Sequence, residues 1–141
     1  MGGSKTAFLA ALMGLFAAGA YAAPIWTLVD EDENIAMSID VQSMVTSPES
    51  VIVDVLIVYK HTQEYEQADG TAIPYVAAVG PFYFGCTGNK FGVSNRTTLY
   101  RSADTTEDPI GTYLDKSFTG KFYMLDAPPG PTLQKIAKLV C

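Results

Sequence analysis

The alternation of hydrophobic and polar positions predicts a series of short β-strands followed by one helix. After an apolar run over residues 7–18, the apolar segments are short and are separated by polar stretches that contain glycine, proline or aspartate. Segments with the composition of strands are 25–29, 35–39, 51–60, 73–86, 90–101 and 121–125. The stretches between them, at 40–50, 61–70 and 102–119, are predicted to be loops.

The segment 51–60 gives the strongest strand signal in the chain. Its residues are apolar as far as position 59 except for Asp54, and a strand that is apolar on both faces belongs in the middle of a sheet. The next strand contains Gly80-Pro81, which predicts a bulge or a bend. Thr87-Gly88-Asn89 predicts the hairpin turn into 90–101, because glycine and asparagine accept the positive φ that such turns require.

The C-terminal segment has the pattern of a single amphipathic helix. Pro131 suits its first turn, where the missing N–H group is not needed. The apolar positions recur at i, i+3, i+4 and i+7 and form one stripe, made by Leu133, Ile136, Ala137 and Val140. The sequence therefore predicts an α+β fold: an antiparallel meander of about six strands with one C-terminal amphipathic helix packed on it.

Residues 1–22 have the pattern of a secretory signal peptide. Lys5 precedes the apolar run, and Ala20-Tyr21-Ala22 supplies the small residues that a signal peptidase requires. A membrane anchor is the competing interpretation, but the run is shorter than the roughly 17–25 residues that span a bilayer. We therefore expect export and a mature domain over 23–141 without a membrane span. Lipid attachment is not expected, since no cysteine lies at the cleavage point.

Export also affects the interpretation of the two cysteines. Cys86 and Cys141 both lie in the mature part, and two thiols in an oxidising compartment usually pair. The alternative is two independent buried thiols. A disulfide is favoured because Cys141 is the last residue and a chain end gains most from being tied down. It would clip the end of the helix to the strand before the hairpin.

Charge and histidine content argue against nucleic acid binding and against catalysis. The chain has 9 Lys+Arg and 15 Asp+Glu, a net charge of −6, which becomes −7 once Lys5 leaves with the signal peptide. A nucleic acid partner would need a basic face. His61 is the one histidine, and a histidine beside a strand end is more often a surface residue than a catalytic base. We expect no enzyme activity.

No metal or cofactor site is predicted either. Asp30, Asp32 and Asn34 match the opening of an EF-hand loop, but such a loop needs glycine at its sixth position and glutamate at its twelfth. Those positions hold Ile35 and Val41. One histidine and two paired cysteines leave zinc without ligands. The acidic run is therefore predicted to be a solvated turn.

One segment is locally basic in this acidic chain. No Asp or Glu occurs from position 70 to 103, whereas Lys90, Arg96 and Arg101 all lie on the predicted strand 90–101. The simpler interpretation is that these cations are solubilising groups. The functional interpretation is a strip that binds an acidic protein surface or a sulfated glycan. The six-residue spacing of Lys90 and Arg96 places them on one face, with Arg101 on the other face or beyond a bend.

The mature chain as a whole resembles the surface-adhesin protein E family of Gram-negative bacteria. The resemblance rests on the order of its features: Trp26, Ser38-Ile39-Asp40, the Val51–Tyr59 strand, Cys86 before a hairpin, and Gly130–Cys141 with its terminal Leu139-Val140-Cys141. It implies a six-stranded antiparallel sheet with the helix fastened to it by a disulfide. It also implies dimerisation and adhesion to host matrix proteins such as vitronectin and laminin.

Two classes of function are compatible with these features. The favoured one is an exported, non-enzymatic binding protein that acts as an adhesin on the outer surface of a Gram-negative cell. The alternative is a structural or accessory domain of an envelope complex in the periplasm. The two differ in where the mature protein resides, so localisation distinguishes them.

Overall fold

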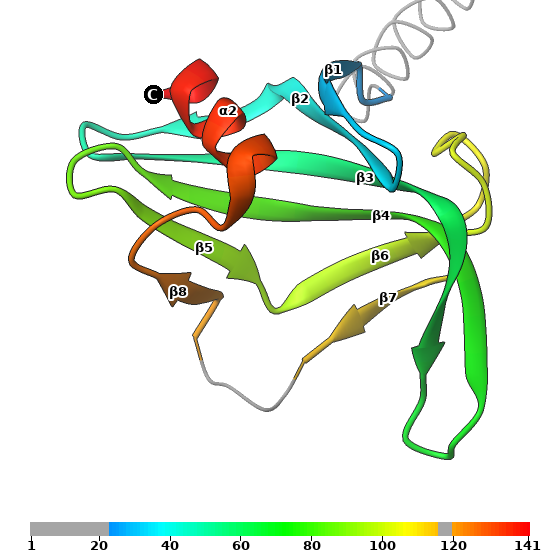
Figure 1. Ribbon diagram of the computed structural model, residues 1–141. Coiled ribbons are helices and arrows are strands. Elements are labelled where there is room, and N and C mark those ends of the chain that lie inside the picture. Colours follow the sequence, from blue (N-terminus) through cyan, green and yellow to red (C-terminus); the bar gives the residue numbers. More distant parts are fainter. Residues whose placement is uncertain (1–22, 116–119) are drawn as a thin grey trace, which may run out of the picture.

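The computed structural model of the protein describes residues 23–115 and 120–141 (Figure 1). The predicted signal peptide, 1–22, lies outside the described residues. The described part contains eight strands and one helix, in the order β1 (Trp26–Glu31), β2 (Ile35–Thr46), β3 (Ser50–Glu66), β4 (Ala72–Gly85), β5 (Lys90–Ser94), β6 (Arg96–Tyr100), β7 (Gly111–Leu114), β8 (Phe122–Leu125) and α2 (Gly130–Val140).

All strands pair antiparallel in one sheet with the order β1-β2-β3-β4-β5-β8. In addition, β6 pairs with β4 and β7 pairs with β6, so β4 carries β5 along one half and β6 along the other (Figure 1). The predicted fold class is confirmed, and β3 lies in the middle of the sheet as its apolar pattern indicates. The sheet has eight strands rather than about six and is branched rather than a simple meander.

The segment 40–50 is not one loop, because β2 continues to Thr46. Its pairing with β3 breaks between Asp40 and Val45 and then resumes. Ser43 fills the break: its hydroxyl donates to the carbonyl of Asp40 at 2.6 Å and accepts the N–H of Asp54 at 2.8 Å. The polar residues that predicted a loop thus form a bulge within a strand.

The predicted loop 61–70 is also wrong for most of its length. Strand β3 runs to Glu66, and its pairing with β4 resumes at Gln63 opposite Tyr75 after an irregularity. Ladder hydrogen bonds join backbone groups, so a polar segment can extend a strand whose register is already set. The turn itself is short and ends at Gly70, which has a φ of +87°.

The predicted strand 90–101 is divided at Asn95 into β5 and β6. The N–H of Asn95 donates to the carbonyl of Lys121 at 3.1 Å, and its carbonyl accepts the N–H of Asp115 at 2.7 Å. This residue therefore lies where the chain leaves β8 as a partner and takes β7 instead. The predicted loop 102–119 contains β7, a strand of four residues that the polar composition around it conceals.

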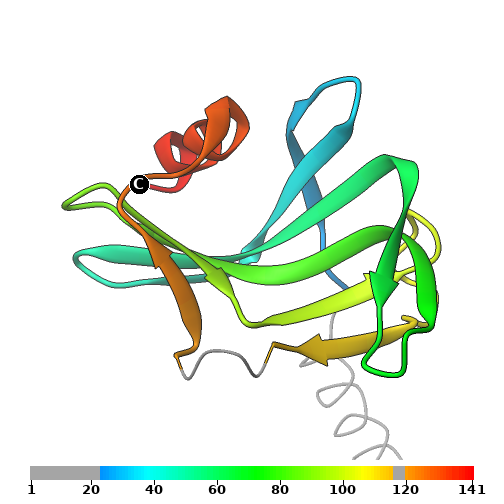
Figure 2. The same cartoon turned by 60° about the horizontal axis from the view of Figure 1, so that its bottom comes forward.

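One face of the sheet, which we call the helix face, carries the core. Helix α2 lies across this face (Figure 2) and buries its own Ile136 fully against the sheet. The buried cluster around it is made by Met37, Ile39, Val53, Val55, Phe82, Phe84 and Phe91. Side chains at alternate positions point to the opposite, back face. There Trp26 donates from Nε1 to Thr105 Oγ1 at 2.9 Å, which ties the loop after β6 to β1.

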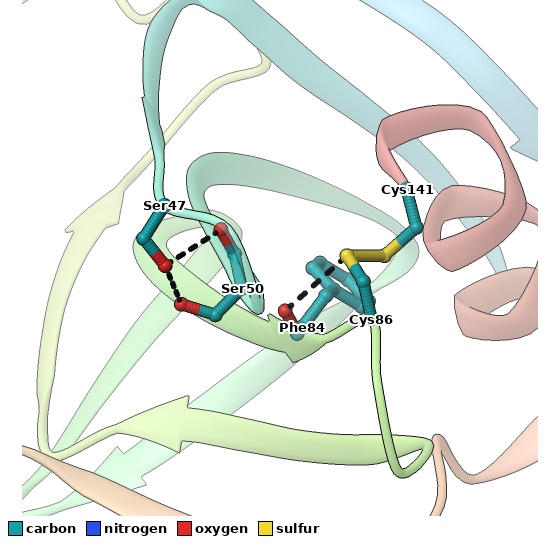
Figure 3. Close-up of a disulfide and its surroundings, with 5 residues drawn as sticks. All are labelled: Ser47, Ser50, Phe84, Cys86 and Cys141. Atoms are coloured by element: carbon teal, nitrogen blue, oxygen red, sulfur yellow. Dashed lines mark hydrogen bonds between the residues drawn. A yellow bond between two sulfur atoms is a disulfide. The ribbon is translucent and has the colours of Figure 1, made fainter.

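The predicted disulfide between Cys86 and Cys141 is confirmed, with a Cα–Cα distance of 5.5 Å (Figure 3). Cys141 also donates its N–H to the carbonyl of Ala137 at 3.0 Å, so the crosslink lies directly at the end of α2. Cys86 donates its N–H to the carbonyl of Glu49 at 2.8 Å. The helix end is therefore joined to the region where the β2–β3 and β4–β5 turns meet.

Candidate functional site

Lys90 and Arg96 both lie on the back face of the sheet. Lys90 precedes the buried Phe91, and Arg96 lies three residues before the buried Leu99, so strand alternation directs both cations away from the helix face. The whole of β5 separates them, a distance of about 20 Å at the usual rise per residue. The shared face agrees with the sequence-based expectation, but the two side chains do not form a single cluster.

The structure brings Lys121 close to Arg96, which the sequence did not indicate. Both residues line one hollow of about 390 Å³ on the back face, together with Ile52, Pro81, Ser94, Asn95 and Phe122. Pairing of Ser94 with Phe122 between β5 and β8 places Lys121 there. The two cations are 25 positions apart in the sequence, so the only available signal was a strand pairing that composition does not reveal.

Because Arg96 and Lys121 line this hollow, we call it the basic hollow. Its lining contains no Asp or Glu. Among the described residues, salt bridges join Lys60 to Glu31 and Lys135 to Asp30, and none involves Lys90, Arg96 or Lys121. These three side chains belong to exposed residues, so they can reach a partner from solvent.

Arg101 is set apart from the other two predicted cations. It follows the end of β6 and begins a polar loop that is rich in acidic residues. In this loop the hydroxyl of Ser102 donates to Glu107 Oε2 at 3.0 Å, and Asp104 accepts the N–H of Thr106 at 3.0 Å. The pKa of Asp104 is lowered by its hydrogen bonds from Thr106. Arg101 therefore begins an acidic loop and does not line the hollow that contains Arg96 and Lys121.

His61 and the carboxylates of the acidic turn do not form a metal-binding cluster. His61 is exposed on β3. In the acidic turn, Asp32 Oδ1 accepts the N–H groups of Asn34 and Ile35, which lowers its pKa and uses the carboxylate to shape the turn. Within the ranges that the structure describes, no three His, Cys, Asp or Glu side chains are arranged to hold a metal ion.

One carboxylate pair was not anticipated from the sequence. Asp40 and Asp54 are directly opposite each other on β2 and β3. Asp40 is buried and accepts the N–H of Gln42 at 3.0 Å. Burial, and then the charge of Asp40, raises the pKa of Asp54. The pair was hidden because the sequence predicts a loop over 40–50, a range that includes Asp40.

A second feature that the sequence did not reveal is a cavity of about 280 Å³ on the helix face, beyond the end of α2. Val55, Ile57, Phe82 and Leu99 contribute apolar lining, and Ser94, Arg96 and Thr97 also border the cavity. Four tyrosines line it as well: Tyr59, Tyr65, Tyr75 and Tyr113. The rings of Tyr59 and Tyr75 meet edge to face, with centroids 5.8 Å apart. Burial raises the pKa of both hydroxyls. We call this space the tyrosine cavity.

The comparisons with known proteins agree on one family. A sequence model of the surface-adhesin protein E family matches residues 26–141, nearly all of the described chain. No curated protein matches the sequence at a significant level. In the part of the chain that the structure describes, no helix is long and apolar enough to cross a membrane.

Solved structures of protein E from Haemophilus influenzae share the fold. The selenomethionine form has a TM-score of 0.54 at 17% identity, over 85% of this chain and 92% of that chain. Crystal form II has a TM-score of 0.55 at 16% identity, over 85% and 96%. Protein E from a non-typeable strain has a TM-score of 0.55 at 17% identity, over 85% and 81%.

Proposed function

Because the chain belongs to the surface-adhesin protein E family, we propose that it is an exported, non-enzymatic adhesin of a Gram-negative bacterium. The signal peptide pattern of residues 1–22 supports export. The proposed partner is an acidic segment of a host matrix protein, such as vitronectin or laminin, or a sulfated glycan. Dimerisation, which the family resemblance implies, stays a prediction that sedimentation equilibrium would measure.

The basic hollow on the back face is the observation that carries this proposal. Arg96 and Lys121 present two cations there, and no Asp or Glu lines the hollow, in a mature chain of net charge −7. An acidic ligand would be steered to this place and repelled by most of the remaining surface. Arginine binds carboxylates and sulfates through two parallel hydrogen bonds, so Arg96 is the proposed anchor.

The apolar surroundings of the hollow also suit a protein partner. Phe122 lines the hollow, and its ring lies 5.8 Å from that of Tyr83. Met124, two positions farther along the same strand, β8, is 45% exposed. Interfaces gain most of their affinity from aromatic and arginine anchors in partly enclosed sites. Lys90 lies on the same face at the far end of β5 and would extend the contact.

The test compares three single charge reversals in the mature, oxidised protein. Arg96→Glu and Lys121→Glu alter the hollow, whereas Lys138→Glu makes the same change in net charge on the exposed side of α2. Binding to immobilised vitronectin, laminin and heparin is measured at low and at physiological salt. We expect at least a tenfold loss for each hollow variant, little change for Lys138→Glu, and weaker wild-type binding as salt rises. The melting temperatures of the Arg96→Glu and Lys121→Glu variants should be unchanged, because neither side chain makes a salt bridge.

Two results would contradict the proposal. Equal losses in all three variants would mean that net charge, and not this hollow, governs binding. A wild-type protein that binds none of these ligands at low salt would favour the periplasmic accessory role. Antibody labelling of intact cells, compared with permeabilised cells, gives an independent answer, since an adhesin must be accessible from outside.

A further inference from the structure

Strand β8 forms an edge of the sheet beside the basic hollow. Among the described residues it pairs with β5 and with no other strand, and it lies at the border of the sheet in Figures 1 and 2. Its first residue, Phe122, lines the basic hollow together with Lys121, the residue before it. A strand added along this edge would therefore run past the cations of the proposed adhesion site.

The register of β8 shows which of its backbone groups face away from β5. Asn95 donates its N–H to the carbonyl of Lys121 at 3.1 Å, and this pair continues the β5–β8 register by one position. Along an antiparallel ladder, hydrogen-bonded pairs alternate with pairs whose backbone groups point outward. Tyr123 therefore directs its N–H and C=O groups toward β5, whereas Phe122 and Met124 direct theirs away from the sheet.

The two sides of this edge differ in character. Leu125 packs against the buried cluster of the helix face, so alternation places Tyr123 on the helix face and Phe122 and Met124 on the back face. Both Tyr123 and Met124 are exposed. A segment paired with β8 would have the basic hollow on its back-face side and an aromatic ring on its helix-face side.

The other edge strands do not suit an acidic segment. Strands β1 and β7 also pair with a single strand each. Strand β1 ends in two carboxylates and leads into two more, at residues 30–33, which would repel such a segment. Strand β7 has no charged residue and does not line the basic hollow. At β8 the adjacent carboxylate, Asp126, lies at the opposite end of the strand from Lys121.

We propose that β8 binds an extended acidic segment of a protein partner as an additional strand of the sheet. This inference rests on the proposed adhesion function and adds the mode of binding to it. The partner's backbone pairs with the outward N–H and C=O groups of Phe122 and Met124, and its acidic side chains, at alternate positions, lie on the back face beside Arg96 and Lys121. A sulfated glycan has no such backbone and would use only the hollow.

Hydrogen exchange of the free, mature, oxidised protein tests the geometry of the edge. Measured by NMR, the amides of Phe122 and Met124 should exchange fast, whereas the amide of Tyr123, which faces β5, should exchange slowly. Slow exchange of Phe122 and Met124 at every protein concentration would mean that another part of the chain covers the edge. Slow exchange that appears only at high concentration would mean that a second copy covers it. Either result would overturn the proposal.

The binding test replaces one outward N–H group. Met124→Pro removes it without removing a hydrogen bond to β5, since proline is tolerated in an edge strand where its nitrogen faces solvent. Binding to immobilised vitronectin and laminin should weaken about tenfold or more, because one donor is lost and the ring obstructs the added strand. Met124→Ala is the matched control: it removes the side chain, keeps the N–H group and should bind nearly as the wild type does. Heparin binding should be the same in both variants and the wild type.

A second measurement does not depend on any variant. When the wild-type protein is saturated with vitronectin or laminin, the amides of Phe122 and Met124 should become protected from exchange. Unchanged exchange there, or full binding of these proteins by Met124→Pro, would overturn strand addition and leave the basic hollow as the adhesion site. A wild type that binds heparin alone would also overturn it, because the partner would then be a glycan. Only a wild type that binds none of the three ligands would overturn the adhesion proposal as well.

Discussion

Removing the disulfide should cost the protein a large part of its stability. The change is the double variant Cys86→Ser/Cys141→Ser in the mature protein. The crosslink joins residues 55 positions apart, and the chain-entropy estimate for a loop of that length is about 4 kcal/mol. For a domain of this size, that loss in the free energy of unfolding corresponds to a fall in melting temperature of about 15 °C.

The assay is thermal unfolding followed by near-ultraviolet circular dichroism, with urea titration as an independent measure of the free energy. Wild-type protein in a reducing agent should melt at the temperature of the double variant, which controls for effects of the serines. A fall of less than about 4 °C would refute the reasoning. It would mean that the unfolded chain is not restricted by the crosslink to the extent that the entropic account requires.

A double-mutant cycle with Ile136→Ala tests where the disulfide acts. Ile136 is fully buried between α2 and the sheet, so its truncation should cost about 2–5 kcal/mol in the oxidised protein. If the disulfide acts through the unfolded chain, α2 stays docked without it, and Ile136→Ala costs the same in the serine background. A cost less than half as large would contradict this, because it would show that the helix leaves the sheet once the crosslink is gone.

Two further substitutions test the sheet itself. Asp54→Asn should raise the melting temperature at neutral pH, because the raised pKa of Asp54 means that folding penalises its charged form. The gain should vanish below pH 3.8, the ordinary pKa of the group, where Asp54 is protonated in both the folded and the unfolded chain. An equal gain at neutral pH and below pH 3.8 would contradict the raised pKa of Asp54. Gly92→Ala should lower the free energy of unfolding by about 1–3 kcal/mol, since the new Cβ would lie 2.7 Å from Met124 Sδ and 3.0 Å from Phe122 Cβ. An unchanged urea unfolding curve would contradict this, because it would show that β8 can shift away from β5 without cost.

The elements with strong local signals were predictable from the sequence. The apolar run of β3, the glycine and asparagine of the β4–β5 turn, and the amphipathic period of α2 each act over a few residues. The disulfide was predictable because an exported chain with two cysteines has one pairing. Long polar extensions were missed, as in β3 beyond Lys60, because ladder hydrogen bonds depend on the partner strand and not on the side chains.

The parts of the candidate sites that were missed depend on pairing between distant segments. Lys121 joins Arg96 only because β8 returns beside β5. Tyr113 reaches Tyr65 only because β7 pairs with β6 at the far side of β4. Charge and aromatic content were visible in the sequence, but neither residue is marked by its own neighbours. A prediction of either site therefore requires the strand order first.

Strand alternation explains how β6 contributes side chains to two opposite faces of the sheet. Arg96 and Thr97 are adjacent on β6, so alternation sends the guanidinium to the back face and the threonine to the helix face. A slip of one residue would exchange them and would put a charge into the tyrosine cavity. Gly80 makes room for the observed pairing, because the Arg96 carbonyl and the Thr97 hydroxyl approach to 3.1 and 4.0 Å of the place where its side chain would be. The basic hollow and the tyrosine cavity, which share the lining residues Pro81, Ser94 and Arg96, thus depend on the same register.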